Sequence, residues 1–230
     1  MWCDFTLFVI LGSLFSINAG YAVIAPFVPI IFVQKGIAVS YIGLSISLYA
    51  LSYTILGLFV GSWMGSIGRR RTLLIGSSLL GLSFLLNSLL VFMHDSTWFL
   101  WFTMSFRVLQ GVGAAFLNVS TYSIATARYS DSIDSVMTMI KLATGIGLVS
   151  GPAIGSTFFS FLGYAGPFAF FAIIFALLAF FAYISTPDSV EDEMPNGEAD
   201  MLNAGNTRLS YQTIQESIPI EEQSNMNTNS

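Results

Sequence analysis

Residues 57–71 read Gly57-Leu-Phe-Val-Gly61-Ser-Trp-Met-Gly65-Ser-Ile-Gly68-Arg69-Arg70-Arg71. In a helix, Gly57, Gly61 and Gly65 recur on one face at intervals of four, which lets another helix approach closely. The arginines follow at the point where an apolar helix would meet water. A positively charged loop by itself explains the arginines but not the glycines. The stretch therefore predicts the end of a closely packed membrane helix.

Apolar residues dominate the chain on both sides of this stretch. Of the 230 residues, 54% are hydrophobic and 9% are charged, whereas soluble domains carry about 25% charged residues. A bilayer core requires roughly 20 apolar residues per helix, and six runs meet that length. Each run should be helical, because unpaired backbone groups are not tolerated in lipid. We predict an all-α membrane protein with six transmembrane helices. The runs are Phe5–Val33, broken by Asn18, Pro26 and Pro29, then Tyr41–Met64, Thr72–Met93, Trp98–Ala125, Val136–Phe161 and Gly163–Ile184.

The basic residues of the short connections predict the orientation of the helices. Lys and Arg are enriched in cytosolic loops; here Arg69–Arg71 follow the second run and Arg128 follows the fourth. Lys35 is the one basic residue in the connections on the other side. Both termini are therefore expected in the cytosol. The first run is too long for the core of a signal peptide. The sequence leaves open whether the membrane is the plasma membrane or a vesicular one.

Residues 186–230 differ in composition from residues 1–185. They hold nine of the 13 acidic residues and one of the basic residues, Arg208. A segment this polar cannot bury a core. We therefore expect a transmembrane bundle over residues 1–185 and an acidic, disordered cytosolic tail over residues 186–230. The net charge of −5 describes that tail and gives no indication of nucleic-acid binding.

Two basic residues fall inside the apolar runs. Arg107 lies about ten residues into the fourth run, where a charge costs several kcal/mol and faces protein or water rather than lipid. Together with Gln110 it is a candidate for a solute or proton cavity; the alternative is that Arg107 only bonds carbonyl oxygens of a neighbouring helix. Lys141, near the start of the fifth run, either extends to the cytosolic surface or lines that cavity. Asn18 and Tyr21 are the polar candidates of the first run.

The fifth run carries a second stripe of small residues. Gly147, Gly151 and Gly155 recur at intervals of four, so they share one helix face that a neighbour can approach. Pro152 removes a backbone hydrogen bond and is expected to kink the helix.

These patterns, in this order, resemble three motifs of the major facilitator superfamily. The stretch ending in the arginines resembles motif A, in which an acidic residue follows the first glycine by four positions and latches the cytoplasmic gate. Gly65 occupies that acidic position here.

The sequence Arg107-Val-Leu-Gln110-Gly111 resembles motif B, whose arginine is implicated in proton coupling or in organising the central cavity. Gly147 to Gly155 resembles the helix-packing motif C of the antiporter branches. The gating residues implied by motif A are Gly61, Gly65, Gly68, Arg69, Arg70 and Arg71, and those implied for packing by motif C are Gly147, Gly151, Pro152 and Gly155.

The resemblance covers about Phe5–Thr186 and is strongest to the drug and vesicular amine or polyamine proton antiporters. The stretch Ala25-Pro26-Phe27-Val28-Pro29 supports that branch, as do Gly163-Tyr164 and Pro167-Phe168. Members of the branch often carry an acid in the first span and another early in the fifth. This chain has Asn18 and Tyr21 in the first and Lys141 in the fifth. Two basic residues favour an anionic solute, whereas the branch favours a cation, and the sequence leaves both open.

The resemblance implies transmembrane transport of a small solute by a secondary transporter, with proton-coupled antiport in the full-length family. Such transporters hold the solute between two six-helix bundles. We therefore expect the chain to be a half-length or truncated form that needs a second six-span bundle, which would be a missing half, a second copy or a paralogue. The alternative is a non-transporting scaffold or a regulatory partner of a full-length transporter. The expected partners are the lipid bilayer, the solute and protons, and no nucleic acid.

Other functional classes are not favoured by the sequence. His94 is the single histidine and Cys3 the single cysteine, so we expect no metal site and no cofactor. No pair of acids and no serine–histidine pair falls at membrane depth, which argues against an intramembrane protease and an enzyme of any kind. A channel would require a selectivity-filter signature or a repeat of voltage-sensing arginines, and neither pattern occurs.

Overall fold

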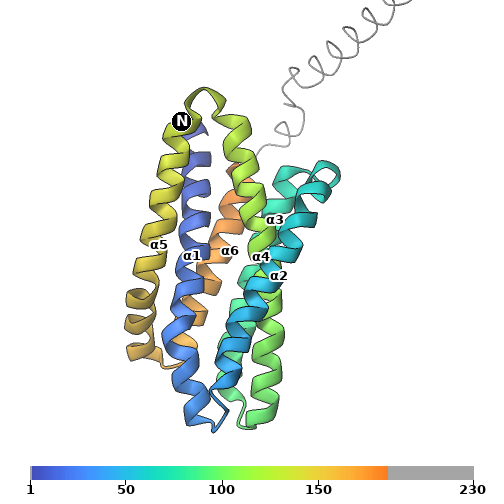
Figure 1. Cartoon of the computed structure of the whole chain (residues 1–230). Helices are drawn as coiled ribbons and strands as arrows, with labels where there is room; N and C mark the ends of the chain where they lie inside the picture. Colours follow the sequence, from blue (N-terminus) through green and yellow to red (C-terminus); the bar gives the residue numbers. More distant parts are fainter. Residues whose placement is uncertain (1, 186–230) are drawn as a thin grey trace, which may run out of the picture. The chain divides into compact units, whose positions relative to one another are not determined.

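Six long helices make up most of residues 2–185, which are the residues that the computed structural model describes (Figure 1). Each is long and apolar enough to cross a membrane, which confirms the prediction of an all-α, six-span protein. Two short 3-10 turns follow α3 and α4. The predicted tail over residues 186–230 lies outside the described residues. The helices are α1 Trp2–Gln34, α2 Ser40–Ile67, α3 Arg69–Leu89, α4 Ser96–Arg128, α5 Ile133–Leu162 and α6 Ala165–Ser185, and the turns are Leu90–Phe92 and Ser130–Ser132.

The first helix is continuous through Asn18, Pro26 and Pro29, the residues that interrupt the apolar run in the sequence. Asn18 does not interrupt the helix because its side-chain amide donates to the Leu14 carbonyl oxygen of the same helix at 2.7 Å. Prolines are tolerated inside membrane helices, where surrounding groups satisfy the backbone atoms that they free. A short turn joins α5 to α6, and Gly163 adopts a φ of 62° there, a conformation that favours glycine.

Glycines determine how closely the helices approach one another. The stripe on α5 packs along α1: an added Cβ on Gly151 would lie 2.6 Å from the Ala19 carbonyl oxygen, and Gly147 meets the Phe15 carbonyl oxygen in the same way. Gly76 of α3 lies against the backbone of Leu117 in α4. Lipid tails supply no hydrophobic drive for helix association, so close backbone contact is a main source of stability. The α1–α5 and α3–α4 pairs are accordingly the most extensive contacts.

Aromatic side chains fill the interface between α3 and α6. The Phe84 ring of α3 lies 5.6 Å from Phe171 and 5.5 Å from Phe175, measured between ring centroids. Rings at this separation gain stability beyond their buried area. Gly20 of α1 makes room for Phe84, since an added Cβ would lie 2.9 Å from that ring. The aromatic cluster thus joins three helices.

Two basic side chains join helix ends at opposite ends of the bundle. Lys35, after α1, donates to the Met93 carbonyl oxygen at 2.7 Å and lies 4.6 Å from the Phe99 ring centroid. Arg70, at the start of α3, donates to the Tyr183 carbonyl oxygen near the end of α6 at 2.8 Å. Each bond supplies a donor to a carbonyl oxygen at or just beyond the end of a helical segment, where such oxygens lack helical partners.

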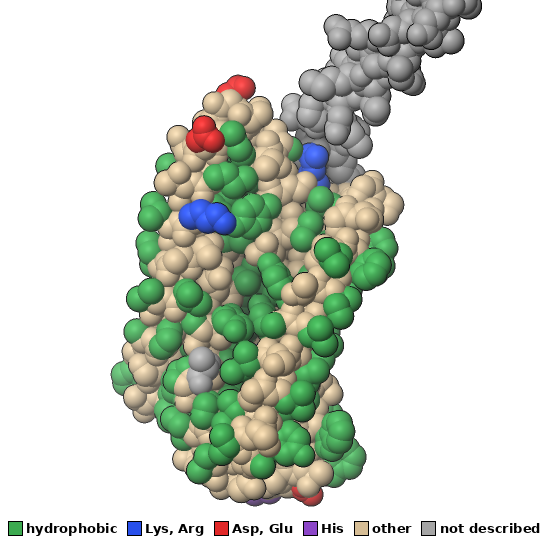
Figure 2. All heavy atoms as spheres, in the orientation of Figure 1, with side chains coloured by type: hydrophobic (Ala, Val, Ile, Leu, Met, Phe, Trp, Pro, Cys, Tyr) green, Lys and Arg blue, Asp and Glu red, His purple; other side chains and the backbone are tan. Residues whose placement is uncertain are grey.

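Helices α2 and α5 are the least buried of the six. Of the residues in their most apolar stretches, 11% and 17% are buried, against 61% for α1. Helix α2 packs mainly on α4, and α5 mainly on α1. Hydrophobic side chains run down the middle of the face that lies between α5 and α2 (Figure 2). Within residues 2–185, these two helices therefore have large apolar surfaces that no other helix covers.

Candidate functional site

Arg107 lies deep inside the bundle on α4. It follows the first residue of that helix, Ser96, by 11 positions, which places it about 17 Å along the helix axis. Its side chain is only 3% exposed. A buried guanidinium remains charged and needs hydrogen-bond acceptors around it. The neighbours of Arg107 therefore decide what this part of the bundle can bind.

The two hydrogen-bond acceptors that Arg107 has among the described residues are neutral side chains. Its Nε donates to Ser45 Oγ on α2 at 3.2 Å, and its Nη1 donates to Gln110 Oε1 at 3.3 Å. The bonds thus run to side chains and not, as the alternative interpretation required, to carbonyl oxygens of a neighbouring helix. Both distances are at or beyond the usual upper limit for such bonds.

Gly111 of α4 lets α2 come close enough for Arg107 to bond to Ser45. An added Cβ at this position would lie 2.6 Å from the Tyr49 carbonyl oxygen and would collide with Ser52 Oγ. The glycine in the motif-B pattern therefore sets the distance between α2 and α4. Any larger residue would move Ser45 away from Arg107.

The amide nitrogen of Gln110 has no hydrogen-bond partner among the residues that the structure describes. The side chain is 1% exposed, and its Nε2 is fully buried. Turning the amide over would point its N–H groups at the Arg107 guanidinium, so the hydrogen-bond pattern itself fixes the orientation. Leaving a buried donor unpaired costs about 1–3 kcal/mol. Gln110 thus holds a buried donor that the described residues leave unpaired.

No carboxylate lies near Arg107 in the described part of the chain. The acidic residues of that part are Asp4, Asp95, Asp131 and Asp134. All four are in the end turns of helices or in the connections between them. Asp95 is engaged at the start of α4, where its side chain accepts from the Thr97 backbone N–H at 2.8 Å. The charge of Arg107 is thus not neutralised by any of the residues 5–185 whose side chains are described.

Several tyrosines lie on the helices and the turn around Arg107. The Tyr21 ring of α1 lies 5.0 Å from the Tyr49 ring of α2, and Tyr49 stacks on Tyr53 at 6.2 Å, both between centroids. Tyr21, Tyr49 and Tyr164 all lie within electrostatic range of Arg107. Burial raises the pKa of Tyr164, in the turn before α6, and the positive charge of Arg107 opposes that rise. We call Tyr21, Tyr49 and Tyr53 the tyrosine row.

The structure brings some of the predicted cavity residues together and keeps others apart. Arg107 bonds to Gln110, and Tyr21 lies within electrostatic range of Arg107. Asn18 is half-buried and its amide bonds within its own helix. Lys141 is exposed, with its Nζ 5.9 Å from the Tyr122 ring centroid. Its exposure agrees with an extended side chain that reaches toward the surface.

Among the motif-A residues, the structure distinguishes one arginine from the other two. Arg70 contacts α6, as described above, whereas Arg71 is exposed and Arg69 half-buried. Gly68, with a φ of 90°, forms the turn between α2 and α3. The predicted close packing on Gly57, Gly61 and Gly65 is not found among residues 2–185, because an added Cβ on these glycines would meet no atom within 4 Å. In motif C, Pro152 is exposed and lies inside the unbroken helix α5.

Sequence reasoning missed Ser45, Tyr49, Tyr53 and Tyr164. A signal was present, since Ser45, Tyr49 and Ser52 recur at helical spacing within the second apolar run and so share one face of the helix. Hydropathy alone does not show that this face points at Arg107.

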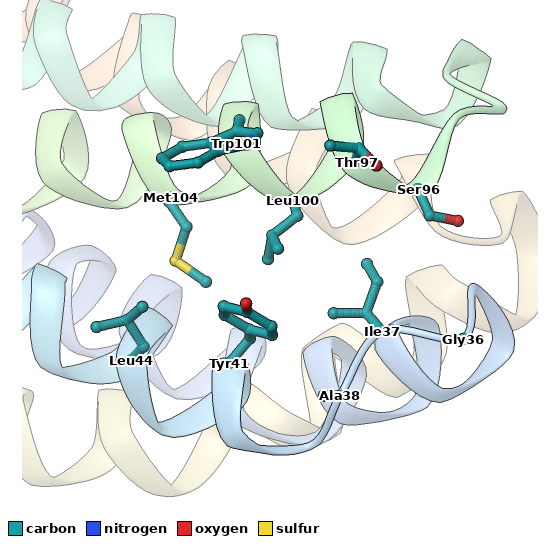
Figure 3. Close-up of a pocket in the computed structure, with 10 residues that line it drawn as sticks. All are labelled: Gly36, Ile37, Ala38, Tyr41, Leu44, Ser96, Thr97, Leu100, Trp101 and Met104. Carbon is teal, nitrogen blue, oxygen red and sulfur yellow. The ribbon is translucent and has the colours of Figure 1, made fainter.

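A separate pocket of about 440 Å³ lies between α2 and α4 at the end of the bundle that holds the α1–α2 connection. Tyr41 and Leu44 of α2 face Leu100 and Met104 of α4 across it (Figure 3). Trp101 lies on the α4 side, and no charged residue lines it. The described residues contain no group of three histidine, cysteine or acidic side chains that would hold a metal ion.

The chain matches the model of one protein family and is similar to several known proteins. The model for the Major Facilitator Superfamily matches residues 10–216. The chain is 26% identical over 173 residues to the MFS-type transporter SLC18B1 of Mus musculus, covering 74% of this chain and 38% of that protein. It is 29% identical over 176 residues to Multidrug resistance protein 2 of Bacillus subtilis, covering 76% and 42%.

A third relative is the Chromaffin granule amine transporter of Rattus norvegicus, 30% identical over 136 residues that cover 58% of this chain and 25% of that protein. The matched part of the chain thus spans between 25% and 42% of the length of these three relatives. The matches agree with the resemblance that the three motifs indicated.

Proposed function

Because this chain belongs to the major facilitator superfamily, we propose that it forms one six-helix bundle of a secondary transporter for a small solute. The observation that carries the proposal is the buried Arg107, which bonds to Gln110 about a third of the way along α4. A charge at this depth is costly and marks a solute or ion pathway by default. The proposed site residues are Arg107, Gln110 and Tyr21.

The proposed transporter also needs a second six-helix bundle. Secondary transporters of this kind hold the solute between two bundles and expose it to each side in turn. Helices α2 and α5 have the largest uncovered apolar surfaces, and the glycine stripe of α2 is open along Gly57, Gly61 and Gly65. These surfaces support packing against a second bundle, which would be a further half, a second copy or a paralogue.

Orientation and coupling are parts of the same proposal. Arg69–Arg71 and Arg128 lie at the ends of helices, and basic residues are enriched on the cytosolic side. We therefore propose that these ends and both termini face the cytosol. Two of the relatives are called a multidrug resistance protein and an amine transporter. We propose proton-coupled antiport on that basis. Lys141, near the cytosolic end of α5, would extend toward the membrane surface.

Flux through proteoliposomes tests the proposal. The full chain is reconstituted alone and with candidate partner bundles, and uptake is measured for a panel of amines, drugs and organic anions with and without an imposed proton gradient. We expect gradient-dependent uptake above that of protein-free liposomes. Arg107→Ala should lose it, whereas Val108→Ala, on the exposed side of the same helix, should retain it.

The scaffold hypothesis makes the opposite prediction. Folded protein that moves no member of the panel, under any gradient and with any partner bundle, would favour a non-transporting scaffold or regulator. Correct folding is checked independently by a cooperative thermal transition in the same lipid.

A further inference from the structure

The pocket between α2 and α4 (Figure 3) is apolar along most of its length and has hydroxyl groups at one end. Leu44, Leu100 and Met104 line the apolar part, whereas Ser96 and Thr97 lie at the end next to the α1–α2 connection. From Ser96 to Met104 the pocket extends about 12 Å along the helix axis. Its volume of about 440 Å³ falls within the roughly 300–1,000 Å³ of small-molecule sites. The pocket therefore suits an elongated molecule that is polar at one end only.

The pocket opens on the outer side of the α2–α4 pair, away from α1. Ser45 faces α4, since it bonds to a residue of that helix, and Tyr49 faces α1, since its ring contacts Tyr21. A helix turns by about 100° per residue, so Tyr49 is rotated from Ser45 in one direction. Tyr41 and Leu44 precede Ser45 and are rotated from it in the other direction. The opening therefore lies at the periphery of the helix pair and not on the side of the tyrosine row.

The bilayer itself supplies material that can fill this pocket. Trp98 and Trp101 are exposed at the same end of α4, and tryptophans are enriched where head groups meet the hydrocarbon core. The apolar part of the pocket thus lies at the depth at which acyl chains begin. An apolar cavity stays dry, and an empty one leaves its lining without contacts on one side. An acyl chain that enters from the periphery would provide these contacts.

The charges around the pocket favour a lipid chain over a charged solute. None of the lining residues within the described part of the chain is charged, so a charged solute would lose its hydration there without gaining a partner. Lys35 and Asp95 adjoin the lining in sequence, but both are engaged. The Lys35 Nζ donates to the Met93 carbonyl oxygen, and Asp95 accepts from the Thr97 backbone N–H. The acyl chain should therefore matter more for binding than the charge of the head group.

We propose that this pocket binds one acyl chain of a membrane lipid, with the end of the chain at Leu44 and Met104 and the head-group end at Ser96 and Thr97. The inference goes beyond the proposed transport function and does not depend on it. The hydroxyl end of the pocket lies toward the head groups and the apolar end toward the hydrocarbon core, which matches the change in polarity along a lipid.

Photo-crosslinking of the full chain in a bilayer tests where the lipid chain lies. The probe is a phosphatidylcholine with a diazirine near the end of one acyl chain, present at low mole fraction, and peptide mass spectrometry locates the adducts. Met104 is 7% exposed, so a lipid that only surrounds the protein has little access to it. Ile173 on α6 is 61% exposed and reports on the surrounding lipid. We expect adducts at Met104 at least as often as at Ile173.

A second buried residue and a second probe serve as controls. Phe116 lies on the same helix as Met104 and is 8% exposed, but it does not line the pocket, so it should carry few adducts. A diazirine placed near the head group should move the adducts from Met104 to Thr97 and Trp101. Phosphatidylglycerol with the same photoreactive chain should give the same pattern as phosphatidylcholine, because the lining residues are uncharged.

Leu44→Trp fills the pocket from the α2 side. The larger side chain should reduce adducts at Met104 to the level of Phe116 and leave those at Ile173 unchanged. Leu51→Trp is the matched control, because Leu51 lies seven residues further along the same face of α2, is 57% exposed and does not line the pocket. This variant should change neither set of adducts. The melting temperature of each variant in the same lipid checks that it is folded.

The adduct pattern decides the inference separately from solute flux. Adducts at Ile173 without adducts at Met104 would show that lipid only surrounds the bundle and would overturn the inference. Adducts at Met104 that persist in folded Leu44→Trp, or that vanish when a partner bundle is present, would overturn it as well. If Leu44→Trp does not fold, the unchanged chain still decides, since equal labelling of Met104 and Phe116 would reject a chain in the pocket.

Discussion

The backbone of Gly151 in α5 lies against Ala19 in α1, so close that an added Cβ would lie 2.6 Å from the Ala19 carbonyl oxygen. This contact is the central member of the stripe by which α5 packs along α1. Gly145 lies on the same helix, yet an added Cβ there would meet no atom within 4 Å. The two glycines therefore form a matched pair.

Gly151→Ala should destabilise the bundle, because α1 and α5 must move apart to admit the methyl group. Overpacking of this kind costs about 1–3 kcal/mol. Gly145→Ala should leave stability unchanged or raise it by up to about 1 kcal/mol through the higher helix propensity of alanine. Thermal unfolding in detergent, followed by tryptophan fluorescence, measures both. Equal melting temperatures would contradict the packing described for α1 and α5.

Gly111→Ala should disturb the site as well as the fold. The methyl group would collide with Ser52 and push α2 away from α4, which lengthens the bond between Arg107 and Ser45. We expect a loss of about 1–3 kcal/mol in stability and loss of solute uptake below the melting temperature. Gly43→Ala, on α2 but outside the stripe of Gly57, Gly61 and Gly65, is the control, since an added Cβ meets no atom within 4 Å there. Full uptake by Gly111→Ala would show that the spacing of α2 and α4 is unimportant.

Arg70 and Arg71 should differ in stability although they are adjacent. The Arg70 guanidinium donates to the Tyr183 carbonyl oxygen and lies 5.0 Å from the Tyr183 ring centroid. Arg70→Gln should lower stability by about 1 kcal/mol, at the lower end for bonds to a charged group because the site is exposed. Arg71 is exposed, and Arg71→Gln should change stability by less than about 0.5 kcal/mol. Thermal unfolding of the two variants checks this, and an equal loss would argue against a specific role of Arg70.

Single-cysteine labelling checks the predicted orientation. In a Cys3→Ser background, His94→Cys reports on the connection between α3 and α4, and Asp131→Cys on the connection between α4 and α5. A membrane-impermeant maleimide applied to the non-cytosolic side should label the first without permeabilisation and the second only after it. Labelling of Asp131→Cys in intact membranes, with protection of His94→Cys, would reverse the orientation.

The sequence alone determined the six spans, because hydropathy and length are properties of each segment by itself. Motif spacing also indicated Arg107 and the α5 stripe, since a charge in an apolar run and glycines at intervals of four are both local patterns. The continuity of α1 through Pro26 and Pro29 was not predictable in this way, because it depends on what surrounds a proline in the folded bundle.

Only the tertiary structure decided which glycines are packed and which polar groups meet. The stripes on α2 and α5 look alike in sequence, yet Gly151 touches Ala19 whereas Gly61 faces no neighbour among residues 2–185. Ser45 reaches Arg107 from another helix, across 62 residues of chain. The rotation of α2 about its own axis decides these contacts, and that rotation depends on packing at Gly111 that no segment specifies alone.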